Sequence, residues 1–365
     1  MAQYDELEKY LRQEEPDKLN RGIAWATAIG LQEVDGLTTS KYLRETAIRN
    51  IEGEISIDEV RKLIKTYYES KDKREADPDN AEEADKVSTN IAKLLGEDAF
   101  VFSPVGLISV HKRIFNGVFN HAGKIRDYNI TKKEWVLNGD TVLYSPASEI
   151  MATLNYDFGE EKKFSYRGLD IDQIIDHIIQ FVSGIWQIHP FREGNTRTTA
   201  VFLIKYLRSL GFSIGNKPFV ENSWYFRNAL VRANVKNPGK GIEQTDEYLK
   251  RFFENLLKGM NHELKNRFTH INYKADRFSG GDDRPSDRPS DQALAVMNVL
   301  KNGEKSRDAI MKALGLSHIP SFRKNYLHPA IEKGWIERTI PDKLTASNQQ
   351  YRLTKMARDL MKNFN

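Results

Sequence analysis

Residues Ile171 to Arg197 read IDQIIDHIIQFVSGIWQIHPFREGNTR. In the first two thirds of this stretch, apolar residues recur at spacings of three and four: Ile171, Ile174, Ile175, Ile178, Val182, Ile185 and Trp186. This period predicts a helix with one face in the protein core. The period continues to His189, and Pro190 ends the helix because the residue before a proline is disfavoured in the α region. His189 is therefore expected at the end of a rigid helix.

A second helix is predicted from Thr196 to Leu210, with Gly211 as the glycine that ends it. Its apolar residues are spread around the whole circumference, which indicates a central, mostly buried helix. The chain is therefore expected to be mainly α. The short segment between the two helices becomes a loop held between buried elements.

This loop carries residue types that suit phosphate chemistry. His189 can act as a base near neutral pH, and Glu193 is a hard oxygen ligand that can hold Mg²⁺ together with substrate phosphates. Gly194 and Asn195 form a tight turn into a helix N-terminus, where free N–H groups attract anions. Arg197 adds a planar donor for phosphate. Read singly, these residues also fit a core histidine, a surface ion pair and a plain turn, but their coincidence within nine residues favours a site.

The loop resembles the signature of the Fic/Doc family, His-x-Phe-x-(Asp/Glu)-Gly-Asn-Gly-Arg-x-x-Arg. The matching residues are His189, Phe191, Glu193, Gly194, Asn195 and Arg197. The resemblance extends over roughly Leu107 to Asn234 and implies a Fic-type helical bundle. Most members of this family transfer AMP from ATP to a Ser, Thr or Tyr hydroxyl of a protein.

Carried over by position, the resemblance implies a role for each loop residue. His189 would deprotonate the target hydroxyl, and Glu193 would hold Mg²⁺ on the phosphates of ATP. Phe191 would anchor the loop in the core. The nucleotide and its phosphates would be bound by Arg192, Gly194, Asn195, Thr196 and Arg197.

Two positions depart from the family pattern. Thr196 replaces the second glycine, and Ala200 replaces the final arginine, which in the family meets the γ-phosphate. The death-on-curing branch, whose members act as kinases, also lacks both residues, although it has a lysine at the position of Thr196. AMP transfer is the first hypothesis. A kinase or another nucleotide-group transferase, and a DNA-binding regulator with a catalytically weak Fic body, are the alternatives.

The segment EWVLNGDTVLYS, which ends at Ser145, predicts a β-hairpin around Asn138-Gly139-Asp140. It is similar to the flap with which the family docks its targets. The docking residues would be Val136, Leu137, Thr141, Val142 and Leu143, through pairing with an extended target segment. A hairpin that only shields the site is the alternative.

Two further predictions concern the nucleotide base and regulation. Residues Glu221 to Val235 form an amphipathic helix in which Tyr225 and Asn228 would contact adenine, by analogy with similar proteins. Ile51-Glu52-Gly53 resembles the inhibitory segment of self-regulated Fic proteins, although the hydroxyl residue expected before it and the usual arginine partner are absent. Glu52 would pair with another cation such as Arg197, or it belongs to a plain helix end.

The chain is predicted to contain an N-terminal helical segment with the inhibitory helix (1–106), a Fic core with its following helices (107–276), a linker (277–290) and a small α+β domain (291–365). The order of three helices and two strands in the last part resembles a winged helix. From Ser290 onward, 13 Lys and Arg face seven Asp and Glu, a net charge of +6, which leaves −2 for the rest of the chain. DNA contact, through Ser321 to Tyr326 at the start of the third helix, is therefore weighed against a protein–protein role.

Composition excludes several classes of function. The 365 residues include no cysteine, which removes disulfides, iron–sulfur clusters and cysteine nucleophiles. The N-terminus lacks the pattern of a signal peptide, and the longest weakly polar run, Gly22 to Leu31, is too short for a bilayer. A cytoplasmic enzyme is expected, with ATP and a protein as its substrates and Mg²⁺ as its cofactor.

Overall fold

The computed structural model describes residues 5–12, 15–69, 81–273, 291–316, 322–332, 334–340, 349–354, 357–358 and 361. The chain divides into two compact units, Met1–Asp283 and Arg284–Asn365, and each has its own hydrophobic core. The linker predicted at residues 277–290 lies outside the described residues.

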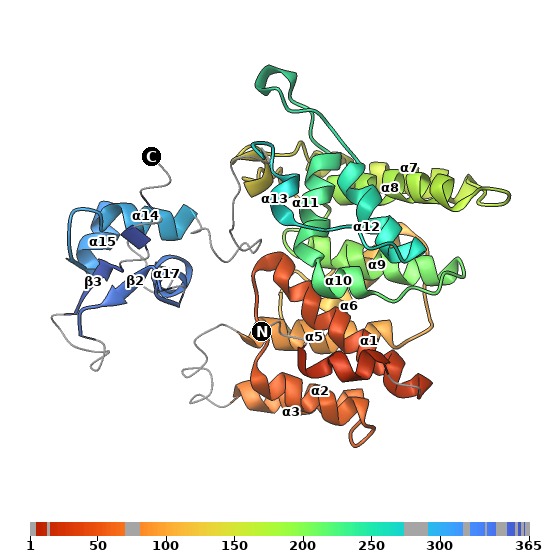
Figure 1. Cartoon of the computed structure of the whole chain (residues 1–365), viewed down its shortest axis with the longest axis horizontal. Helices are drawn as coiled ribbons and strands as arrows, with labels where there is room; N and C mark the ends of the chain where they lie inside the picture. The colour runs from red at the N-terminus through yellow and green to blue at the C-terminus, as the bar shows by residue number, and fades with distance from the viewer. Residues whose placement is uncertain are drawn as a thin grey trace. The chain divides into compact units, whose positions relative to one another are not determined.

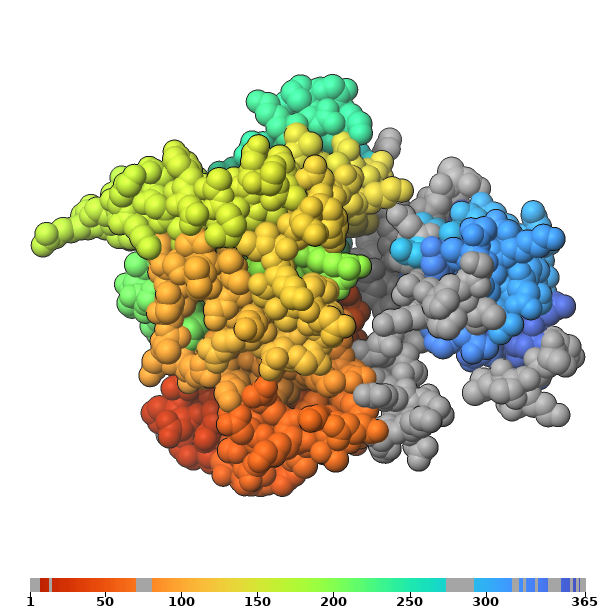
Figure 2. Space-filling model, turned by 180° about the vertical axis from the view of Figure 1, so that it is seen from behind, coloured from red at the N-terminus to blue at the C-terminus, as the bar shows by residue number. Residues whose placement is uncertain are grey.

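The first unit is built from helices (Figure 1). Its elements are η1 (Asp5–Arg12), α1 (Pro16–Gly30), η2 (Leu31–Asp35), α2 (Lys41–Ile51), α3 (Ile57–Glu69), α5 (Ala81–Leu95), α6 (Pro104–Ile114), η3 (Trp135–Leu137), η4 (Ala147–Glu149), α7 (Ile150–Lys163), α8 (Ile171–Ile188), α9 (Asn195–Ser209), α10 (Lys217–Glu221), α11 (Ser223–Ala233), η5 (Pro238–Lys240), α12 (Glu247–Lys258) and α13 (Asn266–Thr269). The connection between α7 and α8 projects from the unit (Figure 2). Among the described residues, no helix combines the length and the apolar character that crossing a bilayer requires.

The two helices predicted around the loop are confirmed. A capping box starts α8: the Gln173 N–H donates to the Asp170 carboxylate, and the Asp170 N–H donates to the Gln173 side chain. Helix α8 ends at Ile188, one residue before the His189 that precedes Pro190. Helix α9 is buried along almost its whole length, as its apolar circumference predicted. The loop is therefore fixed at both ends by rigid elements.

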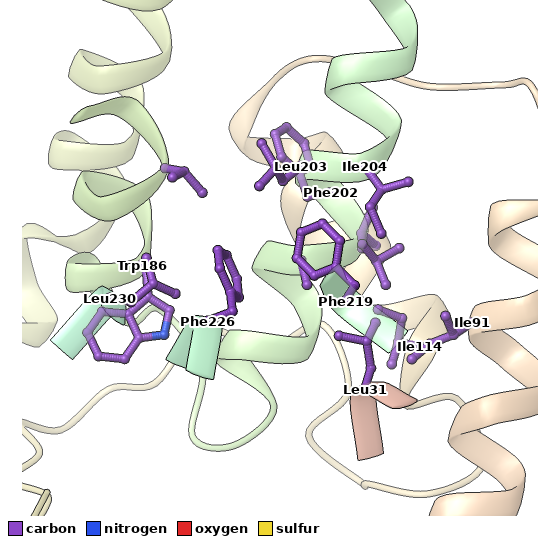
Figure 3. Packing of buried hydrophobic residues seen from close by; sticks show 14 of the residues in the cluster. Leu31, Ile91, Ile114, Trp186, Phe202, Leu203, Ile204, Phe219, Phe226 and Leu230 are labelled. Atoms are coloured by element: carbon purple, nitrogen blue, oxygen red, sulfur yellow. The ribbon is translucent and has the colours of Figure 1, made fainter. Parts of the chain in front are cut away.

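A single core joins the N-terminal helices to the helices around the loop. Figure 3 shows part of it, with side chains from η2, α5, α6, α8, α9, α10 and α11 packed together. The labelled residues are Leu31, Ile91, Ile114, Trp186, Phe202, Leu203, Ile204, Phe219, Phe226 and Leu230. The described residues before 107 thus form one folded body with the loop helices, so they can supply side chains to the site.

The predicted β-hairpin is wrong. The described residues 133–145 contain no strand. They form the 3-10 turn η3 and a loop closed by hydrogen bonds between Glu134 and Asp140 and between Gly139 and Glu134. A strand would place Val136 and Leu137 on opposite faces, but both are buried in the same core. The Val136 carbonyl also accepts a hydrogen bond from the Ile271 N–H. In a hairpin, this carbonyl would pair with the opposite strand or face solvent.

The described part of the second unit has the order helix, strand, helix, helix, helix, strand, strand. Its elements are α14 (Asp291–Val299), β1 (Lys305–Ser306), α15 (Arg307–Ala313), η8 (Arg323–Leu327), α17 (His328–Glu332), β2 (Ile336–Arg338) and β3 (Gln350–Leu353). The strands form an antiparallel sheet of order β1-β3-β2, with Lys305 opposite Tyr351 and Ile336 opposite Leu353. The sequence reading missed β1 but otherwise predicted this α+β unit. Of the proposed DNA-contacting set, Ser321 lies outside the described residues and Phe322 is buried in the core.

Candidate active site

His189 lies at the end of α8 with its ring buried. Its backbone is left-handed (φ 50°), and its Nδ1 lies 3.3 Å from the Trp186 carbonyl oxygen. Because a carbonyl only accepts, Nδ1 carries the proton and Nε2 keeps a lone pair. Nε2 has no hydrogen-bond partner among the described residues. Burial, and the nearby charge of Lys132, hold the pKa of His189 well below its usual value, so the ring is neutral at pH 7 and able to accept a proton.

Two hydrogen bonds between the Asn195 side chain and the Phe191 backbone hold the loop after His189 in shape. The Asn195 side chain accepts from the Phe191 N–H at 2.9 Å and donates to the Phe191 carbonyl at 2.7 Å. Gly194 has φ 73°, and a Cβ at this position would lie 2.2 Å from the ring of Phe115, so only glycine fits. The Glu193 side chain is exposed. Asn195 thus fixes the shape of the loop through its side chain, and the loop presents the Glu193 carboxylate outward.

The N-terminus of α9 has no capping side chain, and Gly194 is its N-cap residue. The N–H groups of its first turn are therefore available to an anion. Thr196 lies in this turn, but its hydroxyl turns inward and accepts a hydrogen bond from the Trp186 indole at 2.9 Å. The substitution of glycine by Thr196 therefore leaves the backbone donors in place, and the hydroxyl itself serves the core.

Arg197 does not face the loop as the sequence suggested. Its side chain is 2% exposed, and its guanidinium group meets three acceptors of the N-terminal helices. Nη1 donates to Gln32 at 3.0 Å, Nη2 lies 2.9 Å from Glu83, and Nε lies 2.7 Å from Asp35. Arg197 would have to leave these partners to contact a phosphate. In this conformation it joins α9 to η2 and α5.

Tyr144, in the loop found at the place of the predicted hairpin, packs against His189 and is linked to Glu134 and Arg227. The ring centroid of Tyr144 lies 4.3 Å from that of His189. The Tyr144 hydroxyl donates to Glu134 Oε1 at 3.0 Å, and Glu134 Oε2 lies 2.7 Å from Nη2 of Arg227 on α11. The sequence reading missed all three residues, since the contacts that join them span 10 to 93 positions. Because Nε2 is buried, a target side chain can reach it only if the side chains packed around His189 move.

Comparison with known families identifies part of the first unit. The model of the Fic/DOC family matches residues 101–207, which include α6, α7, α8, the loop and most of α9. These residues form a domain of the Fic/DOC family. Residues 291–354 match a second model, described as the C-terminal domain of Fic-like filamentation-induced-by-cAMP proteins. The Fic loop is therefore the segment from His189 to Arg197.

Two curated relatives of this Fic protein are named protein adenylyltransferases. VbhT of Bartonella schoenbuchensis is 30% identical over 105 residues, which are 29% of this chain and 21% of the relative. A protein adenylyltransferase of Bartonella henselae is 24% identical over 185 residues, 47% of this chain and 33% of the relative. The chain thus spans between a fifth and a third of the length of these relatives.

Solved structures of Fic proteins also resemble the chain. A Fic family protein of Desulfovibrio desulfuricans is 22% identical, with 94% of this chain and 97% of that one covered and a TM-score of 0.35. BepC of Bartonella tribocorum, solved with bound AMPPNP, is 18% identical, with 52% of this chain and 89% of that one covered and a TM-score of 0.39.

Glu52 does not meet Arg197; the cation with which it pairs is Lys18. Glu52 caps the end of α2, accepts a hydrogen bond from the Tyr10 hydroxyl at 2.6 Å, and lies 3.2 Å from Lys18 Nζ. Lys18 lies in the first turn of α1, whereas Arg197 contacts η2 beyond the other end of that helix. At 1.5 Å per residue the two ends of α1 are about 20 Å apart. Glu52 therefore fastens α2 to η1 and α1, at a distance from the Fic loop.

Lys132 is a cation of the site that the sequence reading did not single out. Its side chain is half-buried, and its ammonium group has no hydrogen bond or ion pair within the described part of the chain. The charges of Glu193, Glu134 and Asp35 act on Lys132. Of the charges that lower the pKa of His189, that of Lys132 has the largest effect. Burial, reinforced by Arg227, lowers the pKa of Lys132. Lys132 is thus a free positive charge next to the Fic loop.

Most of the residues predicted to contact the adenine base or the target are buried, and Leu143 is exposed. Tyr225 and Asn228 are fully buried on α11, and Asn228 donates to Asn266 at 2.9 Å. Neither side chain presents a surface to a base in this conformation. Among the flap residues, Val136, Leu137 and Val142 are buried, Thr141 is half-buried, and Leu143 is 81% exposed. Of these five residues, Leu143 is the one whose side chain is open to a partner.

The residues present fit Mg²⁺ only in company with a nucleotide. Among the described residues, no three His, Asp or Glu side chains gather into a cation site. Glu193 nevertheless presents a carboxylate beside an uncapped helix N-terminus. One carboxylate plus substrate phosphates is a common way in which proteins hold Mg²⁺. Glu193 would be its protein ligand, and the phosphates would supply the rest.

Proposed function

We propose that this Fic protein transfers AMP from ATP to a Ser, Thr or Tyr hydroxyl of a protein, with His189 as the base. The observation that carries the proposal is the unpartnered, unprotonated Nε2 of His189 beside the uncapped N-terminus of α9. The names of the two adenylyltransferase relatives support it. Nε2 takes the proton of the hydroxyl, a bond forms between that oxygen and the α-phosphorus, and the bond from this phosphorus to the β-phosphate oxygen breaks.

The parts of the site divide this work. The first-turn N–H groups of α9 bind and orient the phosphates, and Glu193 would hold Mg²⁺, which neutralises phosphate charge when it is bound. Tyr144 covers His189 until a target arrives. Leu143, exposed beside it, is the contact that this loop offers to the target chain. The kinase alternative uses the same base and cradle with the nucleotide reversed, so the transferred group decides between them.

The test uses ATP labelled separately at the α and the γ phosphorus. The full chain is incubated with Mg²⁺ and each label, and incorporation into the chain and into added proteins is measured. We expect label from the α position alone. Label from the γ position alone would overturn the proposal in favour of a kinase. No incorporation from either position, together with salt-sensitive duplex binding, would favour a DNA-binding regulator.

The acid limb of the pH–rate profile should lie below pH 6.5. The folded protein lowers the pKa of His189, so the base stays unprotonated as the pH falls through the value at which an ordinary histidine takes up a proton. Initial rates of α-label incorporation at saturating ATP should therefore be flat from pH 8 to pH 6.5. A rate that is already halved at pH 6.5 would contradict this assignment.

Replacing Lys132 by methionine should raise the half-saturating concentration of ATP about tenfold or more. A hydrogen bond to a charged group contributes about 1.5–3 kcal/mol, and the charge of Lys132 acts on both His189 and Glu193. Lys133→Met, at the exposed neighbouring position, is the matched control and should leave the half-saturating concentration of ATP unchanged. Equal effects of the two substitutions on ATP saturation would show that Lys132 does not contact the nucleotide.

A further inference from the structure

We propose that two buried residues outside the Fic loop, His111 and Arg126, are positioning residues that fix the two ends of this loop. The catalytic consequence rests on the proposed function, whereas the positioning itself is a property of the folded chain. Neither residue belongs to the family signature quoted above. Each contacts the loop through backbone carbonyls, so neither would be recognised from its distance to a reacting atom.

His111 holds the end of the loop that carries Glu193. It lies on α6 and is fully buried, with its ring parallel to Phe191 at a centroid distance of 3.8 Å. The Gly123 N–H donates to Nδ1 at 2.8 Å, so Nδ1 carries no proton and the hydrogen of the neutral ring lies on Nε2. Nε2 lies 3.1 Å from the Glu193 carbonyl oxygen and donates to it. One fixed tautomer thus ties α6 to the backbone of Glu193.

Arg126 holds the other end of the loop, next to His189. Its Nε donates to the His189 carbonyl at 2.8 Å, and its Nη2 donates to the Ile188 carbonyl at 3.2 Å. The Arg126 N–H donates to the Pro190 carbonyl at 2.9 Å. The guanidinium also reaches the carbonyls of Tyr128 and Ser145. Within the described residues no carboxylate pairs with this buried cation, so its charge is balanced by carbonyl dipoles alone.

The two residues make different predictions because they hold different ends. Losing the His111 bond frees the backbone of Glu193, the proposed Mg²⁺ ligand, and should weaken binding of Mg²⁺·ATP. Losing the hydrogen bonds from the Arg126 guanidinium to the carbonyls of Ile188 and His189 frees the backbone of His189. This loss should slow the transfer step at saturating ATP. A residue that only stabilised the fold would lower the unfolding temperature without this division between binding and rate.

The His111 test compares asparagine with glutamine. In His111→Gln, the amide nitrogen of the new side chain reaches about as far as Nε2 and can still donate to the Glu193 carbonyl. In His111→Asn, the amide oxygen takes the place of Nδ1, so only the hydrogen bond from the Gly123 N–H is kept. Calorimetric titration of the full chain with Mg²⁺·ATP is done in a His189→Asn background, where turnover is expected to be slow. We expect binding about five- to tenfold weaker for His111→Asn, and restored to within about twofold for His111→Gln. Equal affinities for the two variants would overturn the role of His111.

Backbone hydrogen exchange tests the positioning without any activity. In the nucleotide-free chain we expect faster exchange at residues 191–195 in His111→Asn than in His111→Gln. Arg126→Lys keeps the charge but cannot hold several carbonyls at once, so we expect faster exchange at residues 188–191. Unchanged exchange in both variants would overturn the proposal. If His111→Asn does not fold, Arg126→Lys alone tests the proposal. The expected results are faster exchange at residues 188–191 and a slower transfer rate, with the half-saturating concentration of ATP unchanged.

The outcomes separate this inference from the proposed function. If the wild-type chain binds no nucleotide and transfers no label, the proposed function fails, while the exchange pattern still decides the positioning roles. If the wild-type chain transfers AMP but the paired His111 variants behave alike in binding and exchange, the function stands and the positioning role of His111 fails.

Discussion

Replacing His189 by asparagine should slow AMP transfer by about 10²- to 10⁴-fold, the range that a positioned general base supplies. The Nε2 of His189 is buried without a hydrogen-bond partner, and it carries no proton because Nδ1 donates to the Trp186 carbonyl. An asparagine amide at this position offers no basic nitrogen. The Glu193 carboxylate and the first-turn N–H groups of α9 do not depend on the imidazole, so binding of Mg²⁺·ATP should stay within about threefold of the wild-type value.

Asparagine is the matched replacement because of the backbone. His189 has φ 50°, a region that most side chains disfavour and that asparagine tolerates. Within the described residues, Asn138 and Asn216 are the other non-glycine residues with positive φ, at 54° and 51°. An alanine at position 189 would add backbone strain to the loss of the base and would confuse the two effects.

The rate is measured as α-label incorporation under single-turnover conditions, and binding by calorimetry on the same preparation. A slow rate with unchanged binding supports the base. If His189→Asn transfers AMP at more than a tenth of the wild-type rate, another group takes the proton and the assignment of His189 is wrong.

Local pattern was sufficient for the position of His189. The three-and-four spacing of apolar residues fixed α8, and Pro190 fixed its end, because both signals act over a few residues. The same kind of signal failed for Trp135-Val136-Leu137. These residues favour strands, yet all three pack inward, and the Val136 carbonyl pairs with a residue far along the chain. Tertiary burial outweighs strand propensity here.

The roles of polar residues were less predictable, because their partners are distant in sequence. Arg197 meets Gln32, 165 positions away, and Glu83, 114 positions away. Nothing near Arg197 in the sequence signals these acceptors. Thr196 was expected at the phosphate cradle, but its hydroxyl is occupied by Trp186 on the preceding helix. A family motif therefore placed the loop correctly, while the direction of each side chain depended on the rest of the fold.

Removing the charge of Glu134 should destabilise the first unit by about 3–5 kcal/mol. The Glu134 carboxylate is fully buried, and its Oε2 lies 2.7 Å from Arg227, although the two atoms lack the alignment of a good hydrogen bond. Glu134→Gln keeps an acceptor for the Tyr144 hydroxyl but leaves the guanidinium of Arg227, 16% exposed, without its counter-charge. A buried ion that loses its partner costs several kcal/mol.

A double variant measures the interaction energy between Glu134 and Arg227. Arg227→Met keeps an apolar stem beside Trp224 and removes the positive charge. Glu134→Gln together with Arg227→Met leaves no unpaired ion, so it should be more stable than the sum of the single effects predicts, by about 2 kcal/mol or more. Free energies of unfolding come from denaturant titration followed by tryptophan fluorescence. A Trp335→Phe background restricts the signal to the first unit, because the other four tryptophans lie there.

The pair also connects stability to the site. Glu134 fixes the hydroxyl of Tyr144, and the ring of Tyr144 covers His189. Loss of the charge should loosen this cover, so Glu134→Gln should make His189 react faster with diethyl pyrocarbonate even where the chain remains folded. Additive single effects in the double-mutant cycle would show that the two charges contribute independently. Unchanged reactivity of His189 would show that Tyr144 is held by packing against the ring and by Trp186, without help from Glu134.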